Sequence, residues 1–235
     1  MALPKISHPV FETKLPVSQQ VAKYRPMLVK EEKILLVAKQ SGDRADIFNA
    51  VAQIITNCLV SGPKPEAMSL CDMEYLYAQI RANSVGNIIK VSYIDNEDEK
   101  QYDFDLDLTK IGTTEIPTKR TFELPGNINL ALNFPAASLY LKPDFYNLND
   151  SEAFDRVLTS CMFKIYQNDS VFTCSEVPAD ELKAFIDNIP AKSFGEIREF
   201  LAKTPTLSHT FEYKNSKGTE RKINLTSLED FFLFG

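Results

Sequence analysis

The chain contains four cysteines and two histidines, the residue types that most often ligate metals or act as nucleophiles and bases. Metal sites built from cysteine need close pairs, because two ligands come from one tight turn. No such pair exists here, since the cysteines are far apart in sequence: Cys58, Cys71, Cys161 and Cys174. Two of them fall on apolar stripes of expected helices, so the spacing favours buried structural thiols over a metal centre.

The alternation of Asp103, Asp105 and Asp107 could also bind a metal, because oxygens at alternate positions can converge on a calcium ion. The glycine of the sharp turn is missing, and the twelfth position of such a loop is Thr114 rather than glutamate. Period two instead places the three aspartates on one face of a strand, with aromatic and aliphatic residues on the other. A solvated strand face is therefore favoured over a calcium site.

The surrounding stretch, residues 95–107, holds seven acids and one lysine. Three interpretations stay open for it: a solvated face, a charged edge that repels wrong neighbours, and a docking edge for a basic partner. Asp103, Asp105 and Asp107 are the candidate contacts of the third interpretation.

Catalytic motifs are missing from the sequence. It has no GxSxG, HExxH, Walker A or GxGxxG pattern, and only His8 and His209 are available for acid–base work. We expect no enzyme activity and no cofactor, with a hydrolase as a remote alternative.

Composition excludes further classes. The 235 residues carry 26 Lys+Arg against 32 Asp+Glu, a net charge of −6, and the basic residues are scattered, which disfavours nucleic-acid binding. The longest apolar runs, residues 34–38 and 231–234, are far shorter than the roughly 18 residues needed to span a bilayer. With no apolar signal segment at its start, the chain is expected in a reducing cytosol.

The elements that must position these residues indicate an α+β fold of two helix-plus-hairpin modules. The first module, residues 1–145, is expected to contain an extended hairpin over the first 30 residues, three helices, the acidic hairpin and irregular strands. Asp43 can cap the second helix, and Gly42 can end the first.

The second module, residues 146–235, is expected to contain three helices, a hairpin and an aromatic tail. Its first helix is capped by Asp150 or Ser151 and is predicted to run through Ile165. Pro178 opens the second helix, and alternation returns from Leu207.

The modules share an order of elements. At a constant offset of 103 positions Ala50 falls on Ala153, residues 54–58 match residues 157–161 in type, and Cys71 falls on Cys174. A degenerate internal duplication explains the match, and so does an amphipathic pattern common to unrelated helices. The sequence leaves both explanations open.

The end of the chain carries three phenylalanines and a leucine: Phe231, Phe232, Leu233 and Phe234. Exposing them to water is unfavourable, so they either pack back onto the last hairpin or dock into another protein. They are candidate partner contacts.

Several segments resemble the T4-type bacteriophage baseplate protein family, and the resemblance covers nearly the whole chain. They are the opening MALPK, the run YRPMLVKEEKILL over residues 24–36, residues 72–76 and 80–86, and LEDFF near the end. The long run contains Tyr24 and Arg25, which are assigned to partner binding with a scaffold role as the alternative.

Members of this family are described as baseplate hub subunits or hub assembly proteins of contractile-tailed phages, without catalytic residues. The resemblance implies a protein that binds other phage tail or hub proteins in the host cytoplasm during virion morphogenesis. It acts as an assembly factor or chaperone, for example for the tape-measure or a hub protein, or alternatively stays in the tail baseplate as a permanent subunit. Self-association is not predicted either way.

Overall fold

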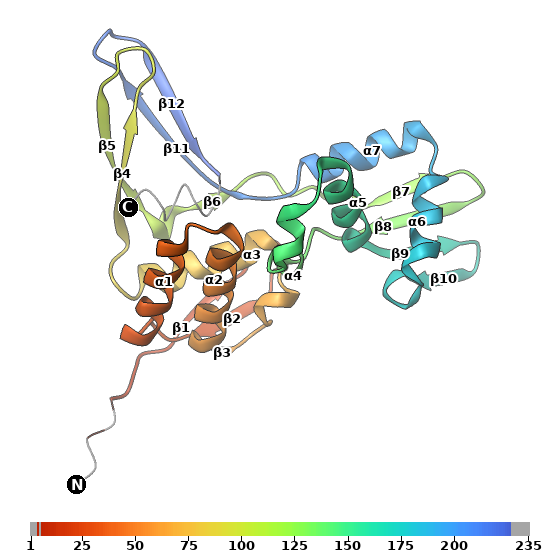
Figure 1. Ribbon diagram of the computed structural model, residues 1–235, viewed down its shortest axis with the longest axis horizontal. Helices are drawn as coiled ribbons and strands as arrows, with labels where there is room; N and C mark the ends of the chain where they lie inside the picture. The colour runs from red at the N-terminus through yellow and green to blue at the C-terminus, as the bar shows by residue number, and fades with distance from the viewer. Residues whose placement is uncertain (1–3, 5, 227–235) are drawn as a thin grey trace. The chain divides into compact units, whose positions relative to one another are not determined.

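The structure, a computed structural model, describes residues 4 and 6–226. This part of the chain forms seven helices and twelve strands, the strands grouped in several small sheets (Figure 1), which confirms the α+β class. The fold has two compact units, one made of the residues up to 114 together with those from 206 onward, and one made of residues 115–205.

These boundaries differ from the expected division near residue 145. Strand β6 (Gly112–Thr113) pairs with the start of β11 (Leu207–Lys214), with Thr113 opposite Leu207. The N–H of Thr114 also donates to the carbonyl of Thr206 at 3.0 Å. Pairing between strands distant in sequence therefore returns the last hairpin to the first unit, which is discontinuous.

The first unit contains three long helices and two hairpins besides its small sheet. Its helices are α1 (Val29–Ser41), α2 (Arg44–Cys58) and α3 (Leu70–Ala82). Its remaining strands are β1 (Phe11–Lys14), β2 (Val21–Tyr24), β3 (Leu59–Ser61), β4 (Ile88–Ile94), β5 (Gln101–Asp107) and β12 (Glu220–Leu225).

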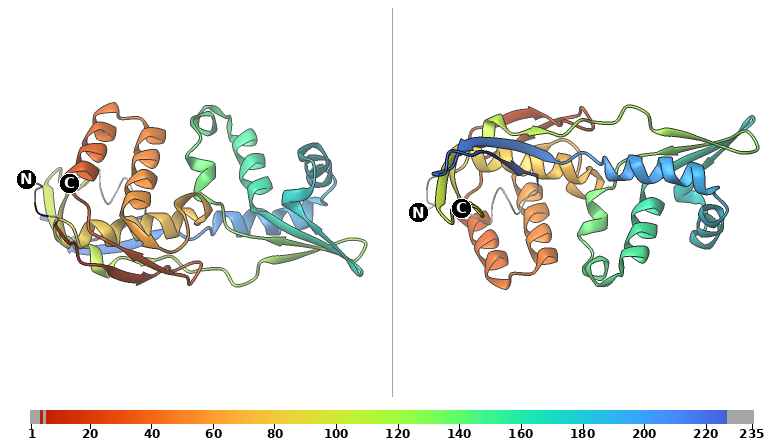
Figure 2. Two further views of the ribbon diagram at one scale, coloured as in Figure 1. Left: turned by 90° about the horizontal axis from the view of Figure 1, so that it is seen from below. Right: turned by 90° about the horizontal axis from the view of Figure 1, so that it is seen from above.

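Side-chain hydrogen bonds begin the first two helices, and the predicted glycine ends the first of them. Glu31 accepts a hydrogen bond from the N–H of Leu28 at 2.9 Å, and α1 stops before Gly42, whose φ of 67° suits glycine. Asp43 caps α2 by accepting from the N–H of Ala45 at 2.7 Å. Figure 2 shows α1 and α2 side by side as an antiparallel pair.

Helix α3 holds the β1–β2–β3 sheet through a buried carboxylate. Asp72 is fully buried and accepts from the N–H groups of Val17 and Ser18 at 2.8 and 2.9 Å. These residues lie in the turn between β1 and β2, so the helix fixes the hairpin that precedes it. Apolar side chains of α2 and α3, including Ile54 and Leu76, are fully buried in the core of this unit.

The second unit is a four-stranded antiparallel sheet with helices. The sheet has the order β10–β9–β8–β7, formed by β7 (Thr121–Leu124), β8 (Ile128–Leu132), β9 (Met162–Gln167) and β10 (Ser170–Thr173). Its helices are α4 (Ala137–Tyr140), α5 (Asp150–Cys161), α6 (Ala179–Asp187) and α7 (Ala191–Ala202). Phe200 of α7 packs against Phe122 and Phe134 at ring distances of 5.5 and 5.3 Å, which joins helix and sheet in one core.

The helix predicted from a cap at Asp150 or Ser151 through Ile165 differs at both ends. Its cap is Asn149, whose side chain accepts from the N–H of Glu152 at 3.0 Å. Helix α5 ends at Cys161, and Met162 begins β9, where it lies opposite Leu132 of β8. Apolar residues in this stretch keep helical spacing on both sides of the joint, so the pattern itself contains no stop. Pairing with β8 satisfies the backbone groups that a longer helix would have used.

Candidate protein-interaction surface

The acidic hairpin β4–β5 has two different faces. Aromatic and aliphatic residues of β5, Tyr102 among them, alternate with the exposed Asp103 and Asp105, as the sequence predicts. The strands pair in register, with Lys90 opposite Asp105 and Ser92 opposite Asp103. One face is therefore available for packing within the protein and the other faces water.

The aromatic face packs against the hairpin β11–β12. Phe104 stacks on Phe211 with ring centroids 4.8 Å apart, and Tyr102 lies 4.7 Å from the ring of Tyr213. Figure 1 shows the two hairpins meeting at their tips, which project away from the helices of the first unit. Burying aromatic rings in this way holds the two hairpins together.

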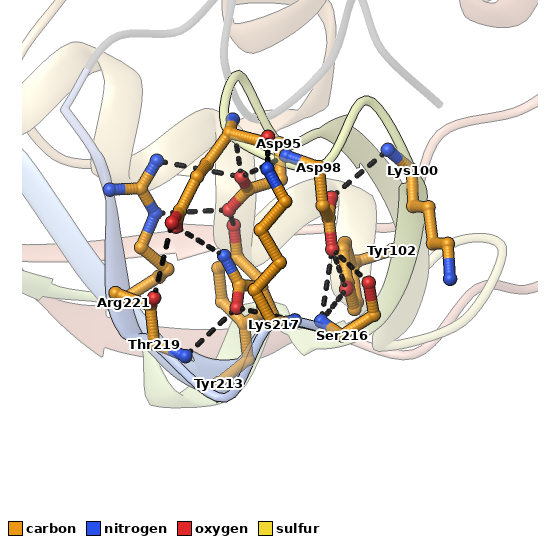
Figure 3. A network of polar contacts seen from close by, with 11 residues as sticks. Asp95, Asp98, Lys100, Tyr102, Tyr213, Ser216, Lys217, Thr219 and Arg221 are labelled. Atoms are coloured by element: carbon orange, nitrogen blue, oxygen red, sulfur yellow. Dashed lines mark hydrogen bonds and ion pairs between the residues drawn. The ribbon is translucent and has the colours of Figure 1, made fainter.

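The turn of the acidic hairpin is neutralised from across this contact. Asp95 is fully buried, accepts from Nε of Arg221 at 3.0 Å, and also accepts from the O–H of Tyr213 (Figure 3). Hydrogen bonds from Arg221 and Tyr213 outweigh the opposing effect of burial and hold the pKa of Asp95 well below its ordinary value.

Two further acids of the turn are bound in the same way. Asp98 accepts from the O–H of Tyr102 at 2.6 Å and from the N–H of Ser216 at 2.9 Å. Burial by itself raises the pKa of Asp98. These hydrogen bonds lower it by more, so the pKa of Asp98 lies well below its ordinary value. Glu97 accepts from Nδ2 of Asn215 at 2.6 Å, and its carbonyl accepts from Nζ of Lys217 at 2.5 Å.

We call this set of contacts between the two hairpin turns the tip clasp. Its acids belong to the stretch 95–107, for which the sequence allows docking of a basic partner. In the structure the groups that bind these acids come from the same chain. The acids on the outer face of the hairpin lie outside the tip clasp and remain available to another molecule.

The outer face of the β4–β5 hairpin combines those acids with exposed isoleucines. Asp103 accepts from Nε2 of Gln101 at 2.8 Å and from Oγ of Ser92 at 2.7 Å, and these hydrogen bonds lower its pKa. Asp107 accepts from the N–H of Thr109 at 3.0 Å, with the same direction of pKa shift. At the two ends of the face, Ile88 and Ile94 are 49% and 62% exposed.

These neighbours explain why the three aspartates are not a calcium loop. Their hydrogen bonds go to separate residues along the strand rather than converging, and opposite Asp105 lies a lysine. Over residues 4 and 6–226, no group of three or more His, Cys, Asp and Glu side chains is placed to hold a metal ion.

Tyr24 and Arg25, assigned to partner binding from the sequence, have roles inside the first unit. Tyr24 is 2% exposed, and its hydroxyl accepts from Nδ2 of Asn83 at 3.0 Å. Arg25 donates to Oε1 of the buried Glu31 at 3.0 Å and to the carbonyl of Asn57 at 2.8 Å. Their availability to a partner in this conformation is therefore small. The other assigned group, Phe231 to Phe234, lies outside the described residues.

All four cysteines are free and buried. Burial raises the pKa of the Cys58 thiol to about 11 and that of Cys161 to about 12, so both stay protonated at neutral pH. His209 packs against the ring of Phe211 at 4.6 Å, and burial lowers its pKa. These groups contribute to packing in the structure.

An exposed apolar surface on α1 lies outside the sequence-based candidates. Val29, Leu36 and Val37 of α1 are all more than half exposed. The signal for it is the run of four apolar residues over 34–37, because a helix packed on one side cannot bury four consecutive residues.

None of the helices in the described part of the chain is long and apolar enough to cross a membrane. A search of curated proteins and a search of solved structures each give no match. One family model does match, over residues 8–233, and it is described as the T4 bacteriophage base plate protein. The chain belongs to this family.

Proposed function

We propose that this base plate protein acts without chemistry, as an assembly factor that holds another tail protein while the baseplate hub forms. The family supports a phage baseplate role. The hub, the chaperone-like action and the partner, either a hub protein or the tape-measure protein, are the parts that we add.

The observation that carries the proposal is a difference between the two packed hairpins. On the outer face of β11–β12, Glu212 pairs with Lys222 at 2.5 Å, and Thr210 donates to Asn224 at 2.8 Å. The outer face of β4–β5 instead has Asp103, Asp105 and Asp107, with Lys90 opposite Asp105 and Lys110 3.6 Å from Asp107, which leaves one carboxylate in excess. Both faces cover similar hairpins, so the unbalanced acid is not needed for this packing.

The composition of that face supports a partner of one kind. Unbalanced carboxylates favour a basic surface, and electrostatic complementarity of this kind adds mainly to the association rate and to specificity. The exposed Ile88 and Ile94 add apolar contact at both ends of the acidic row. We therefore expect a basic protein surface with apolar positions at its margins.

A double variant tests this assignment. Asp103→Asn with Asp105→Asn removes two exposed charges while keeping side-chain volume. If each charge contributes like an exposed ion pair, binding to the co-expressed tail partner should weaken by about 2- to 30-fold. The loss should shrink at high salt, because salt screens exposed charges.

The matched control is Glu212→Gln with Glu220→Gln, which removes two acids from the outer face of β11–β12. Binding is measured by titration calorimetry with each hub and tape-measure protein of the same phage. Equal weakening by both double variants would contradict the assignment of the β4–β5 face and leave only a net-charge effect.

The alternative role is a permanent structural subunit of the hub. An assembly factor leaves the particle, whereas a subunit stays. Quantitative mass spectrometry of purified virions separates the two roles, and recovery of this chain in fixed stoichiometry with known hub proteins would refute the assembly-factor proposal.

A further inference from the structure

The two halves of the chain contain the same joint between a helix and a strand. Helix α2 ends at Cys58 and α5 at Cys161, both fully buried. The next residues, Leu59 and Met162, have nearly identical backbone angles, φ −66° and ψ 127° against φ −65° and ψ 117°. The N–H of Leu59 donates to the carbonyl of Ile55, and that of Met162 donates to Leu158 in the same way.

The strand beside each joint matches as well. The N–H of Arg25, directly after β2, donates to the carbonyl of Cys58 at 2.9 Å, and the N–H of Asn133, directly after β8, donates to that of Cys161 at 2.7 Å. The pairing β2–β3 shifts register between Lys23 and Tyr24, and the pairing β8–β9 shifts at the end of β8 in the same way. A shared amphipathic pattern requires neither bond and neither bulge.

The order of elements continues the correspondence on both sides of the joint. A β-hairpin precedes it in each half, β1–β2 and β7–β8, and a helix follows that leads into a hairpin, α3 to β4–β5 and α7 to β11–β12. The second half adds β10 and α6 and shortens the helix that corresponds to α1. Each difference is an insertion or a truncation within one plan.

The two terminal hairpins correspond down to their turns. Asp95 and Asn215 are both buried and both begin the turn; their side-chain oxygens accept from the N–H two residues later, at 2.8 and 3.1 Å. A tyrosine stands two positions before each of them, Tyr93 and Tyr213.

These corresponding turns also contact each other through equivalent residues. Tyr93 and Tyr213, each two positions before the first turn residue, have ring centroids 6.4 Å apart, and the carbonyl of Glu97 accepts from Nζ of Lys217, each two positions after it. Contacts exchanged between equivalent parts of two hairpins are the mark of an isologous interface.

We infer that residues 11–107 and 121–225 are two copies of one module, and that their terminal hairpins form a self-complementary interaction surface. Within one chain each hairpin covers this surface of the other. The partner that this surface fits is another copy of the same hairpin pair. When the tip clasp is opened, a second copy of this chain therefore becomes the partner of the freed hairpins, and two chains exchange hairpins to form a dimer.

The variant Arg221→Ala in the full chain tests the inference, because it removes the cation bound to the buried Asp95. Its control is Lys222→Ala, a change at the next position of β12 on the opposite face, where the lysine contacts the exposed Glu212. We expect hydrogen exchange in the turn at 215–219 to accelerate roughly ten- to a hundredfold in Arg221→Ala and to stay unchanged in the control.

Oligomeric state gives the decisive measurement. Native mass spectrometry of a mixture of unlabelled and ¹⁵N-labelled chains should show a larger dimer fraction for Arg221→Ala than for the unchanged chain, with mixed-mass dimers and with restored exchange protection of the hairpins in the dimer. The control should match the unchanged chain.

Three results would overturn the inference: unchanged exchange at the turn, accelerated exchange with no increase in dimer, and a dimer whose hairpins remain unprotected. If Arg221→Ala does not fold, Lys217→Ala, which removes only the bond to the carbonyl of Glu97, is judged by the same measurements.

Discussion

Replacing Arg25 by alanine should destabilise the first unit through the charge that it leaves behind. The Glu31 carboxylate has no exposed side-chain surface, and Arg25, whose side chain is 17% exposed, binds it at 3.0 Å. Removing one partner of a buried ion pair costs about 3–5 kcal/mol. Glu31 keeps its hydrogen bond from the N–H of Leu28, so we expect a loss near the lower value, about 3 kcal/mol.

This loss should shift the melting temperature of the first unit down by about 6–12 °C, since 1 kcal/mol corresponds to about 2–4 °C for a unit of roughly 150 residues. Urea unfolding followed by far-UV circular dichroism measures the free energy of unfolding directly. The transition of the second unit should not move, because Arg25 and Glu31 belong to the first.

The loss also depends on pH in a definite direction. Burial by itself raises the pKa of Glu31, but hydrogen bonds from Arg25 and from the N–H of Leu28 lower it more, so the net shift is downward. A lowered folded-state pKa contributes stability that is present above the unfolded value of about 4.3 and is lost as the pH falls through the folded value.

In Arg25→Ala the Glu31 carboxyl stays buried without its cation, so its pKa in the folded protein should rise above the unfolded value. A raised folded-state pKa stabilises the fold only while the carboxyl is protonated, and this contribution is lost as the pH increases. The difference in stability between the two proteins is therefore largest near neutral pH. It should shrink as the pH falls below about 4.

Two variants control this prediction. Lys30→Ala removes a cation that lies 3.6 Å from the same carboxylate. Because the side chain of Lys30 is 66% exposed, its loss should cost less than about 1 kcal/mol. Adding Glu31→Gln to Arg25→Ala removes the buried charge and should recover part of the loss. A loss below about 1 kcal/mol for Arg25→Ala, or a loss that does not change with pH, would refute the reasoning from an uncompensated buried charge.

Two further predictions concern the cysteines and the end of the chain. In the native protein Cys58 and Cys161 should react with a soluble thiol reagent only as fast as the protein opens, because burial raises their pKa values to about 11 and 12. Rapid labelling at neutral pH without unfolding would contradict this. Deleting residues 228–235 should weaken capture of the tail partner more than it lowers the melting temperature, as measured by pull-down and calorimetry. A large drop in the melting temperature, with normal binding by the protein that remains folded, would assign that segment to the core.

Local signals in the sequence predict most of the elements, and they fail where the cause is distant. The cap of Asp43, the stop before Gly42 and the alternation around Asp103 are all found in the structure, because each depends on neighbours within a few residues. The end of α5 is not predictable in this way. Its stop depends on Met162 meeting Leu132 of another strand.

The same limit applies to the division of the chain and to the candidate surface. Alternation places Asp103 and Asp105 on one face, but nothing local indicates that Asp95 is bound by Arg221, 126 positions later. A boundary near residue 145 follows from helix caps alone, whereas the observed boundaries follow from the pairing of Thr113 with Leu207. Both features depend on contacts that only the folded chain forms.

The clasp and the outer face occupy opposite sides of the same strand, so they are coupled. Tyr102 and Phe104 face β11–β12, and Asp103 lies between them on the outer side. A strand held by its aromatic side keeps its carboxylates in fixed positions, which reduces the ordering cost of binding a partner. Binding at the outer face should therefore depend on an intact clasp, and Arg221→Ala, far from the aspartates in sequence, should weaken partner binding as well as open the hairpins.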